Sequence, residues 1–552
     1  MDTTVITTRS IGVLTIASLL VTATYLYIKL YSKRFKQNAH LPQLPPSLLW
    51  GHLRTFDDFT KRGIKDRHPD AIAADMHRAL GKPPIMLLDN WPVVPPIVLV
   101  TTHHVAEQVS KTSTMFQYSA PKSPSADRII DLIGPNSILL KQNERWKAVR
   151  KRFNPGFAPQ HLLTLLPVIV SKVNKYLENI DEFAKSGDVF QLDGLTTNLT
   201  FDIIGAVAMD EEMNAQEPRQ GMLVRMFKEL VKTYADDKLQ LPWWLMPRTH
   251  LRRRRLGQRI TRQLEDIVRR SYEEVSAGVK RDEGRTKSRS ILSLSLNGIQ
   301  SLSPEILAET CDQLKTFLFA GHDTTSTTTI WCIYELSRTP HAMKAVHAEL
   351  DMLFGPGGAR EPTIISDKLL SPGGEDIIYR MTYISAVIKE VLRLHPPAGS
   401  IRAADPGTGF VVSTPEGEYN LDGNWIYLNH TIIHRDRAVY GETADKFVPE
   451  RWLQPNDIPA SAWRPFERGP RNCIGQELAN IEERVIVAML AQRYEFTKVG
   501  LGELETDEHG KFITDSEGYN KTKSELYSLK DDTDHCETGG WDANEGETGV
   551  GK

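Results

Sequence analysis

The stretch Pro-Phe-Glu-Arg-Gly-Pro-Arg-Asn-Cys-Ile-Gly, residues 465–475 of a 552-residue chain, carries the strongest signal about the fold. Its cysteine, Cys473, comes directly before an amphipathic helical pattern at residues 476–493. The N-terminus of a helix and a nearby arginine, Arg471, both favour a negatively charged sulfur, so the stretch indicates a thiolate. The alternative interpretation is a structural cysteine, because free cysteines are commonly buried.

Three other residues of this stretch would serve the cysteine. Gly469 and Gly475 let the backbone turn tightly and bring N–H groups toward the sulfur, and Phe466 can shield it. The pattern Phe-x-x-Gly-x-Arg-x-Cys-x-Gly resembles the haem-ligand loop of the cytochrome P450 family. The resemblance implies that Cys473 is the axial ligand of a haem b iron. It also implies that Arg471 and the other three residues contact the cofactor.

A glutamate and two arginines form a second motif. Glu390 and Arg393 stand three residues apart on a predicted helix, where they share a face and can pair. Such a pair is most often solvated and carries little information alone. Residues 447–452, Phe-Val-Pro-Glu-Arg-Trp, follow and contain Arg451. In the cytochrome P450 family the glutamate and the two arginines interlock behind the cysteine loop. The resemblance therefore implies that Glu390, Arg393 and Arg451 are structural and hold the haem loop.

The third motif, Ala-Gly-His-Asp-Thr-Thr at residues 320–325, lies within a long helical pattern that Pro340 ends. The pattern predicts a helix of about 36 residues, or roughly 54 Å at 1.5 Å per residue. Gly321 and the threonines after it are poor helix formers, and threonine hydroxyls can bond back to carbonyls and distort the helix. A threonine-rich buried face is the alternative. The segment resembles the oxygen-activating part of the family's central helix. That implies that Thr324 hydrogen-bonds dioxygen and that Asp323 relays protons.

Three residues match positions that meet a haem propionate in this family. Trp146 and Arg150 form a Trp-x-x-x-Arg pattern on one helical face, and Arg402 is the third. The planar guanidinium of an arginine can bond both oxygens of a carboxylate. Surface arginines are common, so the motif alone identifies Arg402 less firmly than the cysteine stretch identifies Cys473.

The matched motifs occur in the family's order, so one domain must contain them, although length alone suggests three or four. We expect residues 51–530 to form this catalytic domain. A proline-rich linker at 37–50 precedes it, and an acidic, glycine-rich, disordered tail at 531–552 follows it. The resemblance implies the cytochrome P450 fold, which is mainly α with a minor β region: a large helical haem domain and a small β-sheet subdomain.

The composition is ordinary, with 25% charged residues and a net charge of −3. Nothing in it predicts nucleic-acid binding or general disorder. The four cysteines show no paired spacing. Their spacing argues against a disulfide scaffold or a zinc site and is typical of a reducing compartment.

The N-terminus differs from the rest of the chain. Residues 11–28 carry no charge and precede a basic cluster of Lys29, Lys33, Arg34 and Lys36. About 18 helical residues reach roughly 27 Å, close to the hydrocarbon thickness of a bilayer. We predict a transmembrane anchor at residues 1–36 with the catalytic domain on the basic, cytosolic side. A cleaved signal peptide is the alternative, but the long apolar core and the basic flank argue against it. In this family such a segment implies a single pass through the endoplasmic reticulum membrane.

Two other segments lie outside the motifs. The apolar run Leu-Pro-Trp-Trp-Leu-Met-Pro at residues 241–247 precedes four arginines at 252–255. It can be a loop packed into the core or a second membrane contact, with tryptophans at the interface and arginines on phosphates. The resemblance favours the membrane contact. Residues 500–530 are expected to hold short strands that close the substrate pocket.

A basic face is expected on the cysteine side of the haem. Lys147, Lys151 and Arg152 share one predicted helix, and Arg464 and Arg468 precede the cysteine. Such a face would steer an acidic reductase toward the haem, at a rate that falls as salt rises.

Together the motifs imply a membrane-anchored haem-thiolate monooxygenase. It would receive electrons from NADPH through a reductase, with cytochrome b5 as a further candidate donor. One atom of O2 would enter an apolar small molecule by hydroxylation, epoxidation or a related oxidation. The general pattern resembles fungal members that act in secondary metabolism. Two alternatives are an isomerase or dehydratase that rearranges peroxides without O2, and a non-catalytic haem sensor. Thr324 argues against the first, and the Asp323–Thr324 pair and the anchor argue against the second.

Overall fold

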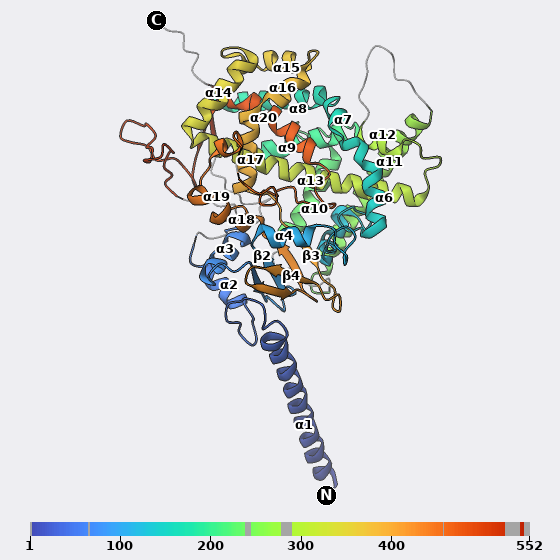
Figure 1. Cartoon of the computed structure of the whole chain (residues 1–552). Helices are drawn as coiled ribbons and strands as arrows, with labels where there is room; N and C mark the ends of the chain where they lie inside the picture. The colour runs from blue at the N-terminus through green and yellow to red at the C-terminus, as the bar shows by residue number, and fades with distance from the viewer. Residues whose placement is uncertain are drawn as a thin grey trace.

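The fold is described from a computed structural model, which covers residues 3–63, 67–237, 244–277, 290–455, 457–524 and 541–545. Helices make up most of the body, and small sheets lie at the end from which α1 (Thr3–Ser32) projects (Figure 1). The helices of the body are α2 (Leu53–Thr60), α3 (Pro69–Ala79), α4 (His103–Ser110), α5 (Ile130–Ile133), α6 (Asn143–Phe153), α7 (Pro159–Leu163), α8 (Leu166–Ser186), α9 (Leu192–Met209), α10 (Met222–Ala235), α11 (Pro247–Ser276), α12 (Ile291–Leu296), α13 (Pro304–Ser337), α14 (Pro340–Phe354), α15 (Pro362–Leu370), α16 (Gly374–Arg380), α17 (Thr382–Leu394), α18 (His430–Ile433), α19 (Arg437–Tyr440) and α20 (Gln476–Ala491). This is the mainly α architecture with a minor β region that the sequence predicted.

A four-stranded sheet forms the minor β region. Its order is β1-β2-β6-β3, with β2 parallel to β6 and the other pairs antiparallel. The strands are β1 (Ile85–Leu88), β2 (Ile97–Val100), β3 (Ser400–Ala403) and β6 (Trp425–Leu428), and β4 (Val411–Thr414) pairs with β5 (Gly417–Asn420). The register places Arg402 opposite Ile426, and the side chain of Arg402 is fully buried.

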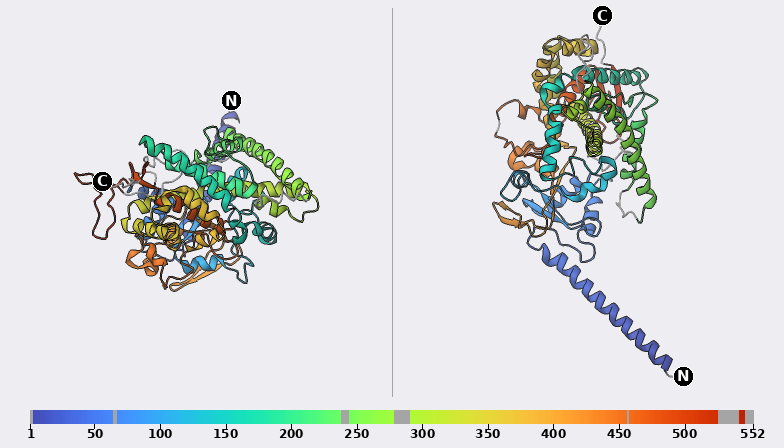
Figure 2. Two further views of the ribbon diagram at one scale, coloured as in Figure 1. Left: turned by 90° about the horizontal axis from the view of Figure 1, so that it is seen from above. Right: turned by 90° about the vertical axis from the view of Figure 1, so that its right-hand side faces the viewer.

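Helix α13 runs through the middle of the helical region, and buried apolar residues of α8, α9, α17 and α20 form one continuous core with it (Figures 1 and 2). As predicted, Ser303 caps it, accepting the N–H of Ile306 at 3.3 Å, and the helix has 34 residues. The hydroxyl of Thr324 bonds back to the carbonyl of Ala320 at 2.8 Å. This is the back-bonding that the sequence indicated for these threonines, and the helix continues through the segment to Ser337. Close packing explains the glycine at position 321, because a Cβ there would lie 2.9 Å from the side chain of Ile204 in α9.

The C-terminal segment differs from the prediction. β8 (Trp541–Glu545) pairs antiparallel with β7 (Tyr494–Lys498), so the predicted disorder of the tail is wrong for these five residues. The free backbone edge of β7 supplies the hydrogen-bond partners that composition could not reveal. Residues 531–540 and 546–552 lie outside the described residues. The strands expected in 500–530 are reduced to isolated bridges such as Leu504 with Thr522 and Thr514 with Asn520, in the part of that segment that the structure describes.

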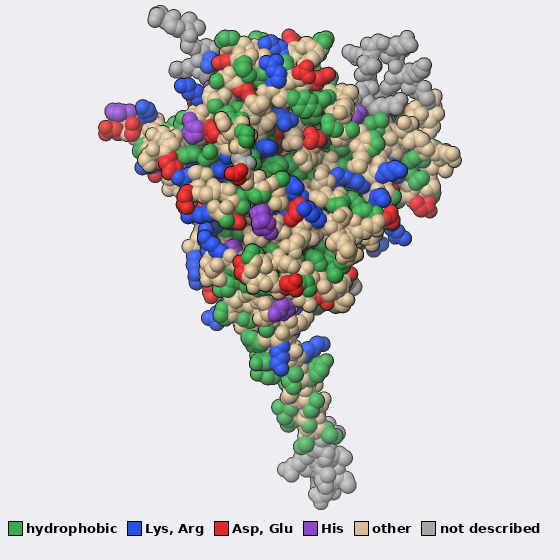
Figure 3. Space-filling model, viewed as in Figure 1, with side chains coloured by type: hydrophobic (Ala, Val, Ile, Leu, Met, Phe, Trp, Pro, Cys, Tyr) green, Lys and Arg blue, Asp and Glu red, His purple; other side chains and the backbone are tan. Residues whose placement is uncertain are grey.

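The N-terminal helix projects from the sheet end of the body (Figures 1 and 2). Val13–Gln37 is long and apolar enough to cross a membrane, and no other helix within the described ranges meets that criterion. Its apolar side chains face outward, as Leu14 and Val21 show with exposed fractions of 69% and 70%. Among the side chains that the structure describes, none in the apolar window of this helix is buried against the body (Figure 3), which is compatible with a membrane anchor.

The segment between α10 and α11 was predicted to be a membrane contact. Residues 241–243, and with them Trp243, lie outside the described residues, while Trp244 and Leu245 are exposed. The four arginines that follow do not act alike. Arg253 is buried and pairs with Asp237 at 3.1 Å, so the prediction that all of them can reach lipid is wrong for this one.

Candidate cofactor site

Cys473 lies in a tight loop that leads into α20. Its N–H donates to the carbonyl of Phe466 at 2.8 Å and closes the loop. Gly469 has φ +76°, and a Cβ at this position would lie 2.1 Å from the carbonyl oxygen of Ser110, so glycine is required. Gly475 is the N-cap of α20. The loop therefore holds the cysteine beside the start of this helix, as the sequence predicted.

Cys473 is exposed and lines an open pocket. It lines a cavity of about 280 Å³ together with Arg150 and the first residues of α20. Burial raises the pKa of the Cys473 thiol, and the N–H of Gly475 and the charges of Arg150 and Lys122 offset part of that rise. The sequence predicted that the protein favours a thiolate and that Arg471 helps. Burial outweighs the effects that favour the thiolate, and the arginine whose charge lowers the pKa of Cys473 is Arg150 and not Arg471. Ligation to a metal ion would lower the pKa of the thiol and favour the thiolate.

Arg402 is buried without enough partners. One guanidinium nitrogen donates to the Ser119 hydroxyl at 3.3 Å, while Nε and Nη2 have no hydrogen-bond partner. The carboxylate of Glu467 lies 3.8 Å away. A buried guanidinium with two unsatisfied nitrogens is costly, so this position calls for an anion.

Two further cations lie close to Arg402. The ammonium of Lys122 donates to the Ser400 hydroxyl at 3.0 Å, and burial and the charge of Arg402 hold its pKa well below the usual range. Arg471 donates to Gln142 at 3.2 Å, and its guanidinium lies 4.7 Å from the ring centre of Trp146. Sequence reasoning missed Lys122, because a lone lysine in a loop gives no signal until the fold brings it beside other cations.

This arrangement fits haem b. Haem offers an iron that a thiolate can ligate and two propionate carboxylates. Lys122 and Arg402 have Glu467 as their nearby carboxylate, whereas the charges that act on Arg471 are those of Arg402 and Arg150. The two propionates would neutralise the remaining positive charge. Arg150, predicted to meet a propionate, instead donates to the carbonyl and side chain of Asn472 at 2.6 and 3.1 Å. It therefore supports the loop beside Cys473.

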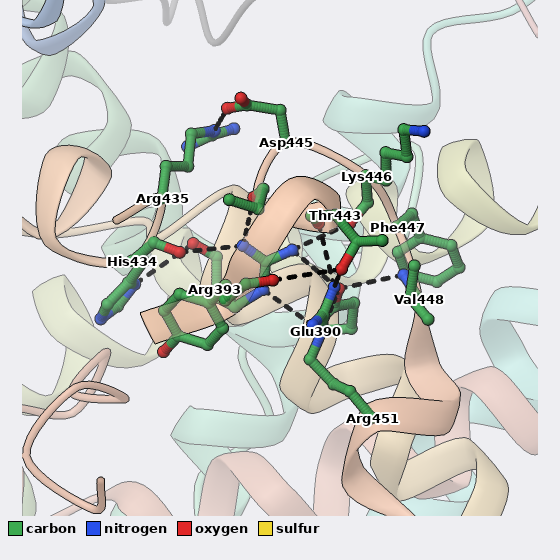
Figure 4. Close-up of polar contacts among 12 residues, drawn as sticks. Glu390, Arg393, His434, Arg435, Thr443, Asp445, Lys446, Phe447, Val448 and Arg451 are labelled. Carbon is green, nitrogen blue, oxygen red and sulfur yellow. Dashed lines mark hydrogen bonds and ion pairs between the residues drawn. The ribbon is translucent and has the colours of Figure 1, made fainter. Parts of the chain in front are cut away.

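Glu390, Arg393 and Arg451 come together in the structure (Figure 4). Arg393 binds the two carboxylate oxygens of Glu390 at 2.8 and 2.9 Å, and Arg451 adds a bond of 2.9 Å. Glu390 and Arg393 are fully buried. Arg393 also donates to three backbone carbonyls, of His434, Ala444 and Lys446. The network thus joins α17 to the segment before the cysteine loop.

His434 continues this network toward the cysteine loop. Its Nε2 accepts the backbone N–H of Arg464 at 3.1 Å, so Nδ1 carries the proton and donates to the carbonyl of Arg393 at 3.2 Å. Burial and nearby positive charges hold the pKa of His434 well below its usual range. A neutral imidazole therefore links the Glu390 network to the cysteine loop, a role that no local pattern indicated.

Part of the third motif forms an accessible face in the middle of α13. Ala320 and Asp323 are exposed and Thr324 is half-buried, whereas most of the flanking residues of this helix are buried. These positions share one helical face. Asp193, at the start of α9, has its pKa raised to about 6 by burial and by the charge of Asp323. Sequence reasoning found no signal for Asp193, because Asp323, the charge that acts on it, lies far away in the chain.

Two adjacent buried glutamates of α20 also escaped the sequence analysis. Glu483 accepts the hydroxyl of Thr329 at 3.1 Å. Burial raises the pKa of Glu482 to about 8 and that of Glu483 well above its usual range. Burial thus favours the neutral form of both carboxyl groups, which lie against the threonine-rich part of α13. A Glu-Glu pair within an apolar helical pattern was the available signal.

The predicted basic face is smaller than expected. Lys147 and Lys151 of α6 are exposed. Arg464 is fully buried and binds Glu467 at 2.6 Å and the Ser110 hydroxyl at 2.7 Å. The prediction is wrong for Arg464, because the loop turns its side chain inward. Arg152 and Arg468 are partly buried and pair with Glu309 and Glu107, respectively.

Known proteins resemble this chain over most of its length. The family model described as Cytochrome P450 matches residues 74–521. The chain is 31% identical over 458 residues to Cytochrome P450 monooxygenase acrF of Aspergillus aculeatus, covering 78% of this chain and 88% of that protein. It is 30% identical over 318 residues to a bifunctional cytochrome P450/NADPH–P450 reductase of Gibberella moniliformis, covering 55% of this chain and 26% of that protein. The solved structure titled "Crystal structure of a Cytochrome P450 (CYP102L1)" matches with a TM-score of 0.65 at 19% identity, covering 81% of this chain and 97% of that one.

Proposed function

Because this chain belongs to the cytochrome P450 family and is a monooxygenase, we propose that it inserts one atom of O2 into an apolar small molecule and reduces the other to water. One observation carries the proposal. Cys473 is exposed in an open pocket, and the buried Arg402 has two guanidinium nitrogens without a hydrogen-bond partner. A haem b group has the ligand-accepting iron and the two carboxylates that such a site requires.

Different residues of this chain would bind the iron and the propionates of the haem. Cys473 would ligate the iron, and Lys122, Arg402 and Arg471 would bind the propionates. Trp146 packs on Arg471 and holds its guanidinium in place. The haem would supply O2 binding and O–O cleavage, which an axial thiolate favours.

Proton delivery is the part that we assign to α13. The Thr324 hydroxyl now donates to the Ala320 carbonyl, but it can rotate to hold a proton at the reacting oxygen. Asp323 lies on the same accessible face and would pass protons to it. Asp193, whose pKa burial and the charge of Asp323 raise to about 6, would resupply Asp323.

Electrons would come from NADPH through a separate reductase, with cytochrome b5 as a further candidate donor. The name of the Gibberella relative joins both activities, which supports this choice of donor. Lys147 and Lys151 would form the docking face for the reductase.

We further propose that α1 anchors the protein in the endoplasmic reticulum membrane by a single pass, with the catalytic part in the cytosol. Both relatives named above come from fungi, which agrees with a role in secondary metabolism.

A ligation experiment tests the core of this proposal. Purified full-length protein, reduced and exposed to carbon monoxide, should show the strongly red-shifted Soret band of thiolate ligation, and Cys473→Ser should lose it. Cys311→Ser, which changes a buried cysteine of α13, is the matched control and should retain the band. Retention of the band in Cys473→Ser would refute the assignment. A substrate converted without O2 or NADPH would favour the isomerase alternative instead.

A further inference from the structure

Glu467, at the start of the cysteine loop, has a backbone conformation that does not suit its side chain. Its φ is +58°, in the left-handed region, and its N–H donates to the carbonyl of Arg464 at 2.9 Å to close a turn. Left-handed backbone favours glycine and, among other residues, Asn and Asp, whose short side chains can bond locally. Strained residues of this kind cluster at functional sites. The turn alone therefore does not explain the glutamate.

The carboxylate of Glu467 is buried and bonded through one oxygen. Its side chain is 8% exposed. Oε1 accepts from the Arg464 guanidinium at 2.6 and 3.2 Å, from the Ser110 hydroxyl at 3.1 Å and from the N–H of Arg468 at 3.1 Å. Oε2 has no hydrogen-bond partner within the described chain. Burial opposes the ionised form, but the charges of Arg464 and other nearby cations lower the pKa of Glu467 to about 2. The cysteine loop therefore carries a buried negative charge.

The unbonded oxygen of Glu467 lies near Arg402, the arginine that we assign to a propionate. Arg402 Nη2 is 3.8 Å from Glu467 Oε2, beyond hydrogen-bond distance. Among the residues that the structure describes, Arg402 Nη2 and Nε have no acceptor. Opposite charges at this separation attract each other in a buried site even without a hydrogen bond. Glu467 thus holds Arg402 by charge and leaves free the two donors that a propionate requires.

The charge of Glu467 also acts close to the sulfur of Cys473. Burial and the charge of Arg402 lower the pKa of Lys122, and the charges of Glu467 and Cys473 both oppose that lowering. The carboxylate and the sulfur are therefore near enough to act on the same buried ammonium. The backbone joins them as well, because the Cys473 N–H donates at 2.8 Å to the carbonyl of Phe466, the residue before Glu467. A metal ion bound to this sulfur would lie in the electric field of the carboxylate.

We propose that Glu467 is a positioning residue that sets the reduction potential of the haem iron, by holding a fixed negative charge beside Arg402 and the cysteine loop. The inference rests on the proposed haem binding. Ferric iron carries one more positive charge than ferrous iron, so a nearby negative charge stabilises the ferric state and makes the potential more negative. The charge also explains the strained backbone, because a glycine would fit the turn but would bring no carboxylate.

Redox titration of the haem-loaded, full-length protein tests this inference. Dithionite is added in the presence of mediator dyes, and the Soret band reports the ferric and ferrous fractions. Glu467→Gln removes the charge at nearly constant size and should have a more positive midpoint potential than the wild type. At the wild-type midpoint, its ratio of ferrous to ferric iron should rise severalfold; a tenfold rise corresponds to about 59 mV.

Two further substitutions of Glu467 separate its charge from its shape. Glu467→Asp keeps the charge and should stay closer to the wild-type potential than Glu467→Gln. Glu467→Gly removes the charge and relieves the backbone strain, so it should shift the potential as Glu467→Gln does. It is judged by the same criterion if Glu467→Gln does not fold. Glu442→Gln is the matched control, because it removes an equal charge from a side chain that is 90% exposed and should leave the potential unchanged.

The outcomes distinguish this inference from the haem binding on which it rests. A wild-type potential in a folded Glu467→Gln or Glu467→Gly variant would overturn the role of Glu467. A shift in Glu467→Asp as large as that in Glu467→Gln would overturn the charge as the cause, and so would an equal shift in Glu442→Gln. Wild-type protein that shows no Soret band would instead overturn the proposed haem binding.

Discussion

Replacing Glu390 by glutamine should destabilise the protein severely, because the change leaves a buried cation without its anion. One carboxylate oxygen accepts hydrogen bonds from Arg393, Arg451 and the N–H of Val448. The other accepts from Arg393 and Trp452. A glutamine replaces one oxygen with an NH2 group, so at least two of these donors would face a donor. Removing one partner of a buried ion pair costs about 3–5 kcal/mol, a large part of a typical stability of about 5–15 kcal/mol.

Equilibrium unfolding in urea, followed by circular dichroism and by the Soret band, measures this loss. Glu442→Gln is the matched control. Glu442 pairs with Arg437 at 3.4 Å on the surface, with side-chain exposures of 90% and 58%. A surface pair of this kind contributes about 0–1 kcal/mol. If Glu390→Gln costs no more free energy of unfolding than the control, the network does not hold the fold together and the reasoning fails.

Three further changes test the site. Thr324→Ala should still bind haem and substrate but divert electrons into hydrogen peroxide, because the proton-bearing hydroxyl is lost; an unchanged ratio of product to NADPH consumed would contradict this. Charge reversal at Lys147 and Lys151 should slow reduction of the iron without changing substrate affinity, and added salt should reduce the difference. If stopped-flow rates of iron reduction in the variant match those of the wild type at low salt, the reductase docks on another face. Acid should destabilise the fold, because burial lowers the pKa of His430 from 6.5 to about 4. The unfolded chain then binds the extra proton below pH 6.5, so stability should fall by about 3 kcal/mol as the pH approaches 4. Urea unfolding across this range measures the slope, which should be smaller in His430→Asn.

Local patterns predicted those parts of the fold that depend on neighbours along the chain. Ser303 and Pro304 marked the start of α13, because a cap and a first-turn proline act within one turn. Glu390 and Arg393 could be paired from their spacing on a helix. The glycine at 469 followed from the turn that the cysteine loop requires. In each case the partners lie a few residues apart, so the sequence itself contains the geometry.

Contacts between distant segments decided the rest. The sequence placed Arg34 in the basic flank of the anchor and Arg464 on a docking face, yet both side chains are buried in polar sockets built by remote loops. Lys122 became a candidate partner of a haem propionate only when folding brought it beside Arg402, and β8 pairs with an edge of β7 that is distant in the chain. Whether a charged side chain meets water or protein depends on which segments cover it, and burial then determines its pKa, its partners and its role. The sequence by itself determined the family and the cysteine loop. The tertiary structure alone decided which charges are desolvated, because desolvation is a property of the packed chain.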